Sequence, residues 1–246
     1  MKRYRWQILL GISLVVLSAL LYLIHYAIFR DTYHIFIYML GDIAFIPAQV
    51  LIVTLIIDRF LREREKRTLL KKLNMVIGAF FSEVGMELLE SFSSFDPNAD
   101  RITPALIVTN DWSEAEFATA SQNIKGYAYE TDALRGDLAD LKRRIVGKRG
   151  FLLRLLENPN LLEHESFTEL LWAVFHLTEE LACRKDVKRL PDSDYAHLAL
   201  DIKRAYSLLI SAWLDYMNHL KKDYPYLFSL ALRTNPFDPN ASPVVA

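Results

Sequence analysis

The sequence predicts an all-α membrane protein, and three observations lead to this prediction. Two long apolar runs, at about 6–29 and 35–57, stand near the start of the chain. The remainder repeats apolar residues at intervals of three and four. It contains no sustained alternation of apolar and polar residues that would indicate strands. We therefore expect a two-span transmembrane hairpin that continues through a stalk helix into a cytosolic helical bundle.

The hairpin is predicted for residues 1–58. Both apolar runs have the roughly 20 residues that a helix needs to cross the hydrocarbon core of a bilayer. Basic residues precede the first run at Lys2, Arg3 and Arg5 and follow the second from Arg59 onward. Positive charge near the end of a span favours the cytoplasmic side of the membrane. We expect a multi-pass protein of a bacterial-type cell membrane with both termini in the cytoplasm.

Two polar residues interrupt the second apolar run. Asp42 lies about seven residues inside it, and Gln49 follows seven positions later on the same helix face. An ionisable side chain at that depth is costly and by default suggests function. One interpretation is a polar stripe that lines an ion path in an oligomer. The favoured one is a clamp that hydrogen-bonds across the hairpin to groups such as Tyr22, His25 and Ser13.

A stalk helix is predicted for residues 59–95, which contain no proline and an apolar seam that includes Leu73 and Phe80. We expect this seam to mediate self-assembly. Gly78 and Gly85 share one face of the stalk and would let another helix approach closely. The first turns are rich in basic residues, namely Arg59, Arg62, Arg64, Lys66 and Arg67. Contact with anionic lipid is one interpretation of these residues. The ordinary positive-inside signal on a solvated helix face is the favoured one.

A cytosolic helical domain is predicted for residues 96–234. Ser113 with Glu116 and Ser166 with Glu169 fit capping boxes that open two of its helices. The longest helix is expected to begin after Pro191 and to end near residue 222. The tail, residues 235–246, contains three prolines and is expected to be extended.

Composition and motifs exclude several classes of function. The net charge of −1 provides no global basic field for nucleic acid, which we do not expect as a partner. Cys183 is the only cysteine, so an intrachain disulfide and a multi-cysteine zinc site are excluded. We interpret it as a small packing residue. The sequence contains no glycine-rich phosphate loop, nucleophile elbow or zinc-protease motif. We expect a non-enzymatic protein without a cofactor.

Three histidines stand four residues from a carboxylate, a spacing that places both side chains on one helix face. The pairs are His176 with Glu180, His197 with Asp201, and Asp215 with His219. Histidines and carboxylates that project inward from facing helices form the metal sites of helical bundles. His176, His197 and Asp201, however, lie off the apolar seams of their helices. We therefore expect these side chains to face solvent and not to form such a site.

The expected function is that of a self-assembling scaffold or signalling component that acts through its cytosolic domain. Its expected partners are the lipid bilayer, further copies of the chain and a cytosolic protein. The first alternative is an oligomeric ion channel lined by Asp42 and Gln49. A membrane-tethered, metal-binding helical bundle is the weaker alternative.

Overall fold

The computed structural model describes residues 2–159, 161 and 164–244, without the side chains of residues 2–7, 34, 67 and 69–71. The described residues form helices and turns and contain no strand, which confirms the all-α prediction. The chain divides into two compact units, Met1–Lys66 and Arg67–Ala246. Helix α2 contributes residues to both units.

The first unit contains α1 (Lys2–Phe29) and the beginning of α2 (Thr32–Phe80), which follow one another after a short turn. Arg30 adopts a left-handed backbone conformation with φ of 47°. Its N–H donates a 2.9 Å hydrogen bond to the carbonyl of Tyr26, as is usual where a helix ends in a left-handed residue. The Asp31 carboxylate then accepts the N–H of Tyr33 at 2.9 Å and caps the start of α2.

Two helical stretches of this unit, Ile8–Phe29 and Ile35–Lys66, are long and apolar enough to cross a membrane. None of the residues in their most apolar windows is buried within the chain. Exposure of apolar surface to water is unfavourable, so an apolar environment around these stretches would stabilise them. Two such helices near the N-terminus could span a membrane, and a signal sequence has the same length and composition.

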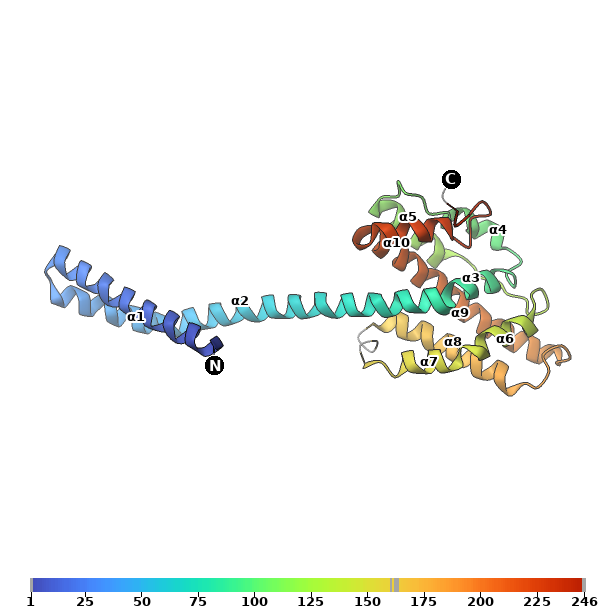
Figure 1. The fold of residues 1–246 in the computed structure, drawn as a ribbon, viewed down its shortest axis with the longest axis horizontal. Helices are drawn as coiled ribbons and strands as arrows, with labels where there is room; N and C mark the ends of the chain where they lie inside the picture. The colour runs from blue at the N-terminus through green and yellow to red at the C-terminus, as the bar shows by residue number, and fades with distance from the viewer. Residues whose placement is uncertain (1, 160, 162–163, 245–246) are drawn as a thin grey trace. The chain divides into compact units, whose positions relative to one another are not determined.

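The second unit is a helical domain built around α9 (Figure 1). Its elements after α2 are η1, a π-helical turn (Phe81–Gly85), α3 (Met86–Ser93), α4 (Ala99–Ile102), η2, a 3₁₀ turn (Thr103–Leu106), α5 (Glu114–Gly126), α6 (Leu138–Gly147), α7 (Arg149–Leu156), α8 (Glu165–Cys183), α9 (Asp192–Asp223) and α10 (Pro225–Arg233). Helix α9 contacts α3, α5, α8, α10 and η1, whereas α6 and α7 pack on α8. Trp213 and Tyr206 of α9 are fully buried and anchor the core.

The apolar seam predicted for the stalk lies in the core of the same domain. Leu73, Phe80 and Leu88 are each no more than 1% exposed. The Phe80 ring packs edge-to-face against Phe167 of α8, with ring centroids 5.4 Å apart. The expectation that this seam mediates assembly between chains is therefore wrong, because its side chains are already covered within one chain.

Of the two capping boxes expected from the sequence, one is present and the other is replaced by a different cap. Ser113 and Glu116 form the expected capping box at the start of α5. The box expected at Ser166 is absent, because α8 begins two residues earlier than that box requires. His164 caps this helix instead, and its Nδ1 accepts the N–H of Phe167 at 3.3 Å.

The C-terminal tail is also not extended as expected. Asn235 is buried, and its side-chain amide donates a 3.0 Å hydrogen bond to the carbonyl of Leu106. Phe237 is buried against Trp213, with ring centroids 5.1 Å apart. The aromatic contact and the amide hydrogen bond hold this part of the chain against the domain. The described residues of the tail, 235–244, form turns and irregular backbone.

The expected approach of another helix is found at Gly78, whereas the close neighbours of Gly85 are Phe80 and Phe81 of its own helical segment. A Cβ atom at Gly78 would lie 3.5 Å from the Tyr216 hydroxyl, in ordinary contact with α9. A Cβ atom at Gly85 would lie only 2.5 Å from Cδ1 of Phe81.

We expect Gly85→Ala to lower the free energy of unfolding by about 1–3 kcal/mol, because the buried ring must move. Gly147→Ala, where a Cβ atom has open space, is the control. Urea unfolding followed by tryptophan fluorescence measures both, and equal stabilities would contradict the prediction.

Candidate metal centre

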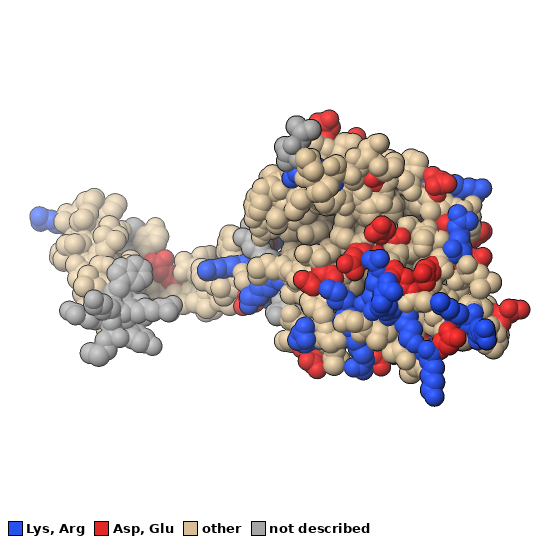
Figure 2. Space-filling model, turned by 45° about the vertical axis from the view of Figure 1, so that its right-hand side comes forward, with Lys and Arg blue, Asp and Glu red and all other residues tan. Residues whose placement is uncertain are grey.

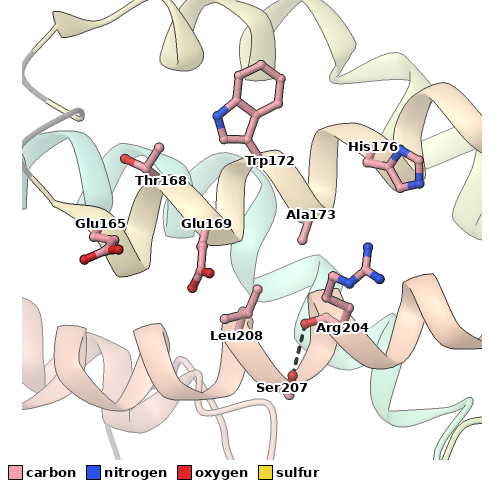
Figure 3. Close-up of a pocket in the computed structure, with 9 residues that line it drawn as sticks. All are labelled: Glu165, Thr168, Glu169, Trp172, Ala173, His176, Arg204, Ser207 and Leu208. Carbon is pink, nitrogen blue, oxygen red and sulfur yellow. Dashed lines mark hydrogen bonds between the residues drawn. The ribbon is translucent and has the colours of Figure 1, made fainter.

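The candidate site lies between α8 and α9, which are consecutive helices joined by residues 184–191. The chain reverses direction in this connection, so the two helices run antiparallel (Figure 3). A residue near the end of α8 consequently lies level with a residue near the start of α9. Both helices bury an apolar seam against the core, and the site forms on the polar flank beside those seams.

Each helix contributes one histidine and one carboxylate, one turn apart. The Nε2 atom of His176 on α8 is 3.5 Å from Oδ2 of Asp201 on α9. The Nε2 atom of His197 on α9 is 3.4 Å from the same oxygen. Glu180 of α8 approaches both rings, with Oε1 3.9 Å from His176 Nε2 and Oε2 3.7 Å from His197 Nε2. The two histidines and Asp201 each offer one ligand atom, and these atoms lie within 4.8 Å of one another.

Asp201 is the buried member of this cluster. Only 5% of its side-chain surface is exposed, and its Oδ2 atom has no hydrogen-bond partner among the described residues. Its Oδ1 atom lies 3.7 Å from a guanidinium nitrogen of Arg204. A buried carboxylate oxygen without a hydrogen bond is costly, because it has lost its hydration without a replacement. A cation between this oxygen and the two imidazoles would compensate that loss.

The two separations between Asp201 and the imidazole nitrogens match metal ligation better than direct hydrogen bonding. Zinc binds imidazole nitrogen and carboxylate oxygen at about 2.0–2.2 Å, so tetrahedral ligand atoms stand roughly 3.4 Å apart. The two nitrogen–oxygen distances to Asp201 are 3.4 and 3.5 Å. Charge-assisted N–H to carboxylate hydrogen bonds are shorter, at about 2.7–2.9 Å. The donor set of two imidazoles and a carboxylate suits Zn²⁺ or Fe²⁺.

Glu180 is fixed at the edge of the cluster by Arg184, the residue that follows α8. A guanidinium nitrogen of Arg184 donates a 2.7 Å hydrogen bond to Glu180 Oε2. Its Nε and its other terminal nitrogen bond both carboxylate oxygens of Asp194, at 2.9 and 2.5 Å. These hydrogen bonds hold the pKa of the Glu180 and Asp194 carboxyls below their usual range. Glu180 therefore stays ionised beside the two histidines, whereas Asp201 is left to interact with them directly.

A groove between the two helices reaches the cluster (Figure 3). Its volume is about 1100 Å³, and His176 and Arg204 stand at the end where the cluster lies. Both histidine side chains are nearly half exposed, at 46% and 47%. An ion and a small ligand can therefore reach the donor atoms from solvent.

The sequence-based interpretation of these residues was partly wrong. His176 and His197 are exposed as expected, but Asp201 is buried and all three converge. The missed signal is that the histidine precedes the acid in both pairs, on two helices joined by a short connection. In an antiparallel pair this order sets each histidine opposite the carboxylate of the other helix.

The third pair is not part of this cluster. The Nδ1 atom of His219 lies 2.9 Å from Asp223 and 3.1 Å from the side-chain amide of Asn74. Its sequence-predicted partner, Asp215, lies one turn earlier and is exposed. Burial lowers the pKa of His219 below its usual value, which favours the neutral ring. Cys183, near the cluster in sequence, is exposed and is not the packing residue that we expected.

Two family models together match most of the chain. The model described as "Uncharacterized protein MJ1433, C-terminal helical domain" matches residues 69–233. The model described as "MJ1433, N-terminal helical domain" matches residues 2–61. The chain belongs to the MJ1433 family. The boundary between the two matched domains falls where the two compact units meet.

A relative from Methanocaldococcus jannaschii, "Uncharacterized protein MJ1433", is 47% identical to this MJ1433-family chain over 238 residues. The match covers 97% of the chain and 96% of the relative. No solved structure matches the chain. Because the relative comes from an archaeon, the comparison does not support the bacterial-type membrane that we expected.

The other residues singled out in the MJ1433-family sequence lie in α2. Asp42 and Gln49 are exposed, and neither has a hydrogen-bond partner within the described part of the chain, so the expected clamp is not formed. Of the basic residues expected near lipid, Arg59 pairs with Glu63 at 3.3 Å and Arg62 pairs with Asp58. Arg64 and Lys66 are exposed, and the side chain of Arg67 lies outside the described residues. Lipid contact and the ion path remain predictions.

Proposed function

We propose that this protein is a membrane-anchored, metal-binding protein whose helical domain holds a divalent transition metal between α8 and α9. The observation that carries the proposal is the convergence of two imidazole nitrogens, at 3.4 and 3.5 Å, on a buried carboxylate oxygen without a hydrogen bond. The ligands are His176, His197 and Asp201, and Glu180 provides a further negative charge beside them. The function is metal binding by a domain attached to a bilayer.

Membrane attachment is proposed from the first unit. Its two apolar stretches expose their surface, and a bilayer would cover that surface without a protein partner. The basic residues before the first stretch and after the second favour a cytoplasmic location for both ends. Reporter fusions at either terminus should therefore be active only for a cytoplasmic reporter. A periplasmic or extracellular signal from the C-terminal fusion would overturn this orientation.

The experiment that tests metal binding uses the full chain in detergent after removal of metal with a chelator. Zn²⁺ and Co²⁺ are titrated by calorimetry, and the Co²⁺ absorption spectrum reports the coordination geometry. We expect one equivalent per chain and a tetrahedral Co²⁺ spectrum. Affinity should fall as the pH is lowered, because protons compete with the metal for the imidazole nitrogens.

A pair of variants separates the proposed site from unspecific histidine binding. His197→Gln removes one proposed ligand and should abolish the equivalent of bound metal. His219→Gln removes a histidine that lies outside the cluster and should leave the stoichiometry unchanged. If both variants bind as much metal as the native chain, the metal does not bind at the proposed site.

Self-assembly through the membrane spans is a second candidate function, and an ion path lined by Asp42 and Gln49 is its most specific form. The favouring observation is that both polar side chains are exposed on α2 without a hydrogen-bond partner among the described residues. Contact between spans of several chains would remove them from lipid. The mass of the complex in nanodiscs tests this idea. Four or more chains would support an ion path, and a monomer or dimer would exclude it.

A further inference from the structure

We infer that the groove between α8 and α9 binds a zwitterionic amino-carboxylate, such as a short peptide, whose carboxylate completes the coordination of the metal. This inference rests on the proposed metal site and adds the chemical class of its ligand. The groove has one end with positive character, an apolar middle and one end with negative character. A molecule with a carboxylate and an ammonium group about two helical turns apart complements that order.

The positive end consists of the metal and Arg204. Three protein ligands leave at least one position open on a tetrahedral ion, and such open sites accept an external ligand. Glu180 does not fill that position, because Arg184 holds its Oε2 atom at 2.7 Å. Arg204 stands beside the cluster, with Nη1 3.7 Å from Asp201 Oδ1. A metal that binds Asp201 frees this guanidinium to pair with an incoming carboxylate.

The negative end consists of Glu165 and Glu169 on α8. Glu169 precedes His176 by seven residues, so the two lie on one helix face about 10 Å apart along the axis. Both glutamates are exposed, and neither has an ion-pair partner among the residues that the structure describes. Figure 3 places the Glu169 carboxylate in the space between the two helices. An ammonium group at this position would meet two carboxylates that no described side chain of the domain neutralises.

The middle of the groove is less polar than its ends. Ala173 of α8 and Leu208 of α9 both line it, between Glu169 and the cluster. Trp172, another lining residue, keeps 57% of its surface exposed, which is unusual for so large a side chain. Contacts to an extended backbone or an alkyl chain would cover these groups. The separation of the charged ends fits three extended residues, which span roughly 10 Å.

The test uses calorimetry to measure the binding of three glycine peptides, which differ only in their terminal groups, to the zinc-loaded full chain. Triglycine carries both charged ends, N-acetyl-triglycine lacks the ammonium group, and triglycine amide lacks the carboxylate. We expect N-acetyl-triglycine to bind up to about fivefold more weakly than triglycine, the usual range for loss of one exposed ion pair. Triglycine amide should bind more weakly still, because it loses the contacts of its carboxylate with both the metal and Arg204. The metal-free chain should lose this preference for a free carboxylate.

Variants assign the two ends separately. Glu169→Gln should weaken triglycine binding and leave N-acetyl-triglycine unchanged, whereas Arg204→Gln should weaken both. Glu179→Gln is the matched control, since Glu179 lies on the same helix but pairs with Arg149. Zinc binding without any preference among the three probes would overturn the groove inference and leave the metal proposal intact. Absence of zinc binding by the native chain would overturn both.

Discussion

Replacement of Asp201 by asparagine is expected to abolish metal binding without destabilising the metal-free protein. The carboxylate is 5% exposed, and its Oδ2 atom is the common neighbour of both imidazoles. Loss of this ligand should weaken Zn²⁺ binding by more than about 100-fold, since even outer-shell changes cost 10- to 100-fold. The metal-free variant should unfold at the same temperature as the native chain or higher, because a neutral amide is cheaper to bury than a carboxylate whose Oδ2 atom accepts no hydrogen bond. Calorimetry and thermal unfolding, each with and without Zn²⁺, provide the two measurements.

The stability measurement distinguishes a metal site from a structural ion cluster. If Asp201 serves to pair with two protonated histidines, its replacement should destabilise the metal-free chain, and added metal should have no effect on the native protein. If it serves as a ligand, the native chain gains stability from metal by mass action, about 2.7 kcal/mol when free metal is 100 times the dissociation constant. Asp192→Asn, an exposed acid in the first turn of α9, is the matched control and should keep both metal binding and stability.

Truncation of Phe80 is expected to destabilise the helical domain without changing the number of chains in the complex. The side chain is fully buried and packs edge-to-face against Phe81 and Phe167, with centroids 5.4 Å away in each case. Phe80→Ala should lower the free energy of unfolding by about 3–5 kcal/mol, the usual cost of removing a buried aromatic ring. Denaturant unfolding measures the stability, and the mass in nanodiscs measures the subunit number.

A second residue of the same helix provides the control for this prediction. Met75 lies five positions before Phe80 and is 64% exposed. Met75→Ala should change stability by no more than about 0.5 kcal/mol, as is usual for surface positions. A Phe80→Ala protein with native stability but fewer chains per complex would show that the seam joins separate chains.

The sequence determined the features that depend on residues close together in the chain. The two apolar stretches are recognised from length and composition, and the capping box at Ser113 from two residues three positions apart. The long α9 helix follows from its regular seam and from Pro191 before it. The His164 cap of α8 was missed because an imidazole acceptor is an uncommon substitute for the usual hydroxyl or carboxylate caps.

Partners that are distant in the sequence could not be assigned in the same way. An apolar seam indicates that a helix face is buried, but not which surface covers it. The seam with Leu73 and Phe80 was therefore open to two partners, and its burial against Phe167 selects contact within the chain. Phe237 is a similar case, since only the position of Trp213 gives that part of the tail a place to pack.

The proposed metal centre also has one part that the sequence predicted and one part that only the packing of the helices decided. Spacing of four residues established that His176 lies near Glu180 and His197 near Asp201, each pair on its own helix. Periodicity on a single helix also located these side chains off the apolar seam, and the two histidines are indeed partly exposed. Only the packing of α8 against α9 decided that the two flanks meet, which buries Asp201 and brings the three donors within 4.8 Å. The physical reason is that hydrogen-bonded helix geometry is local and repeats along the chain, whereas the contact between two helices depends on the side chains of both.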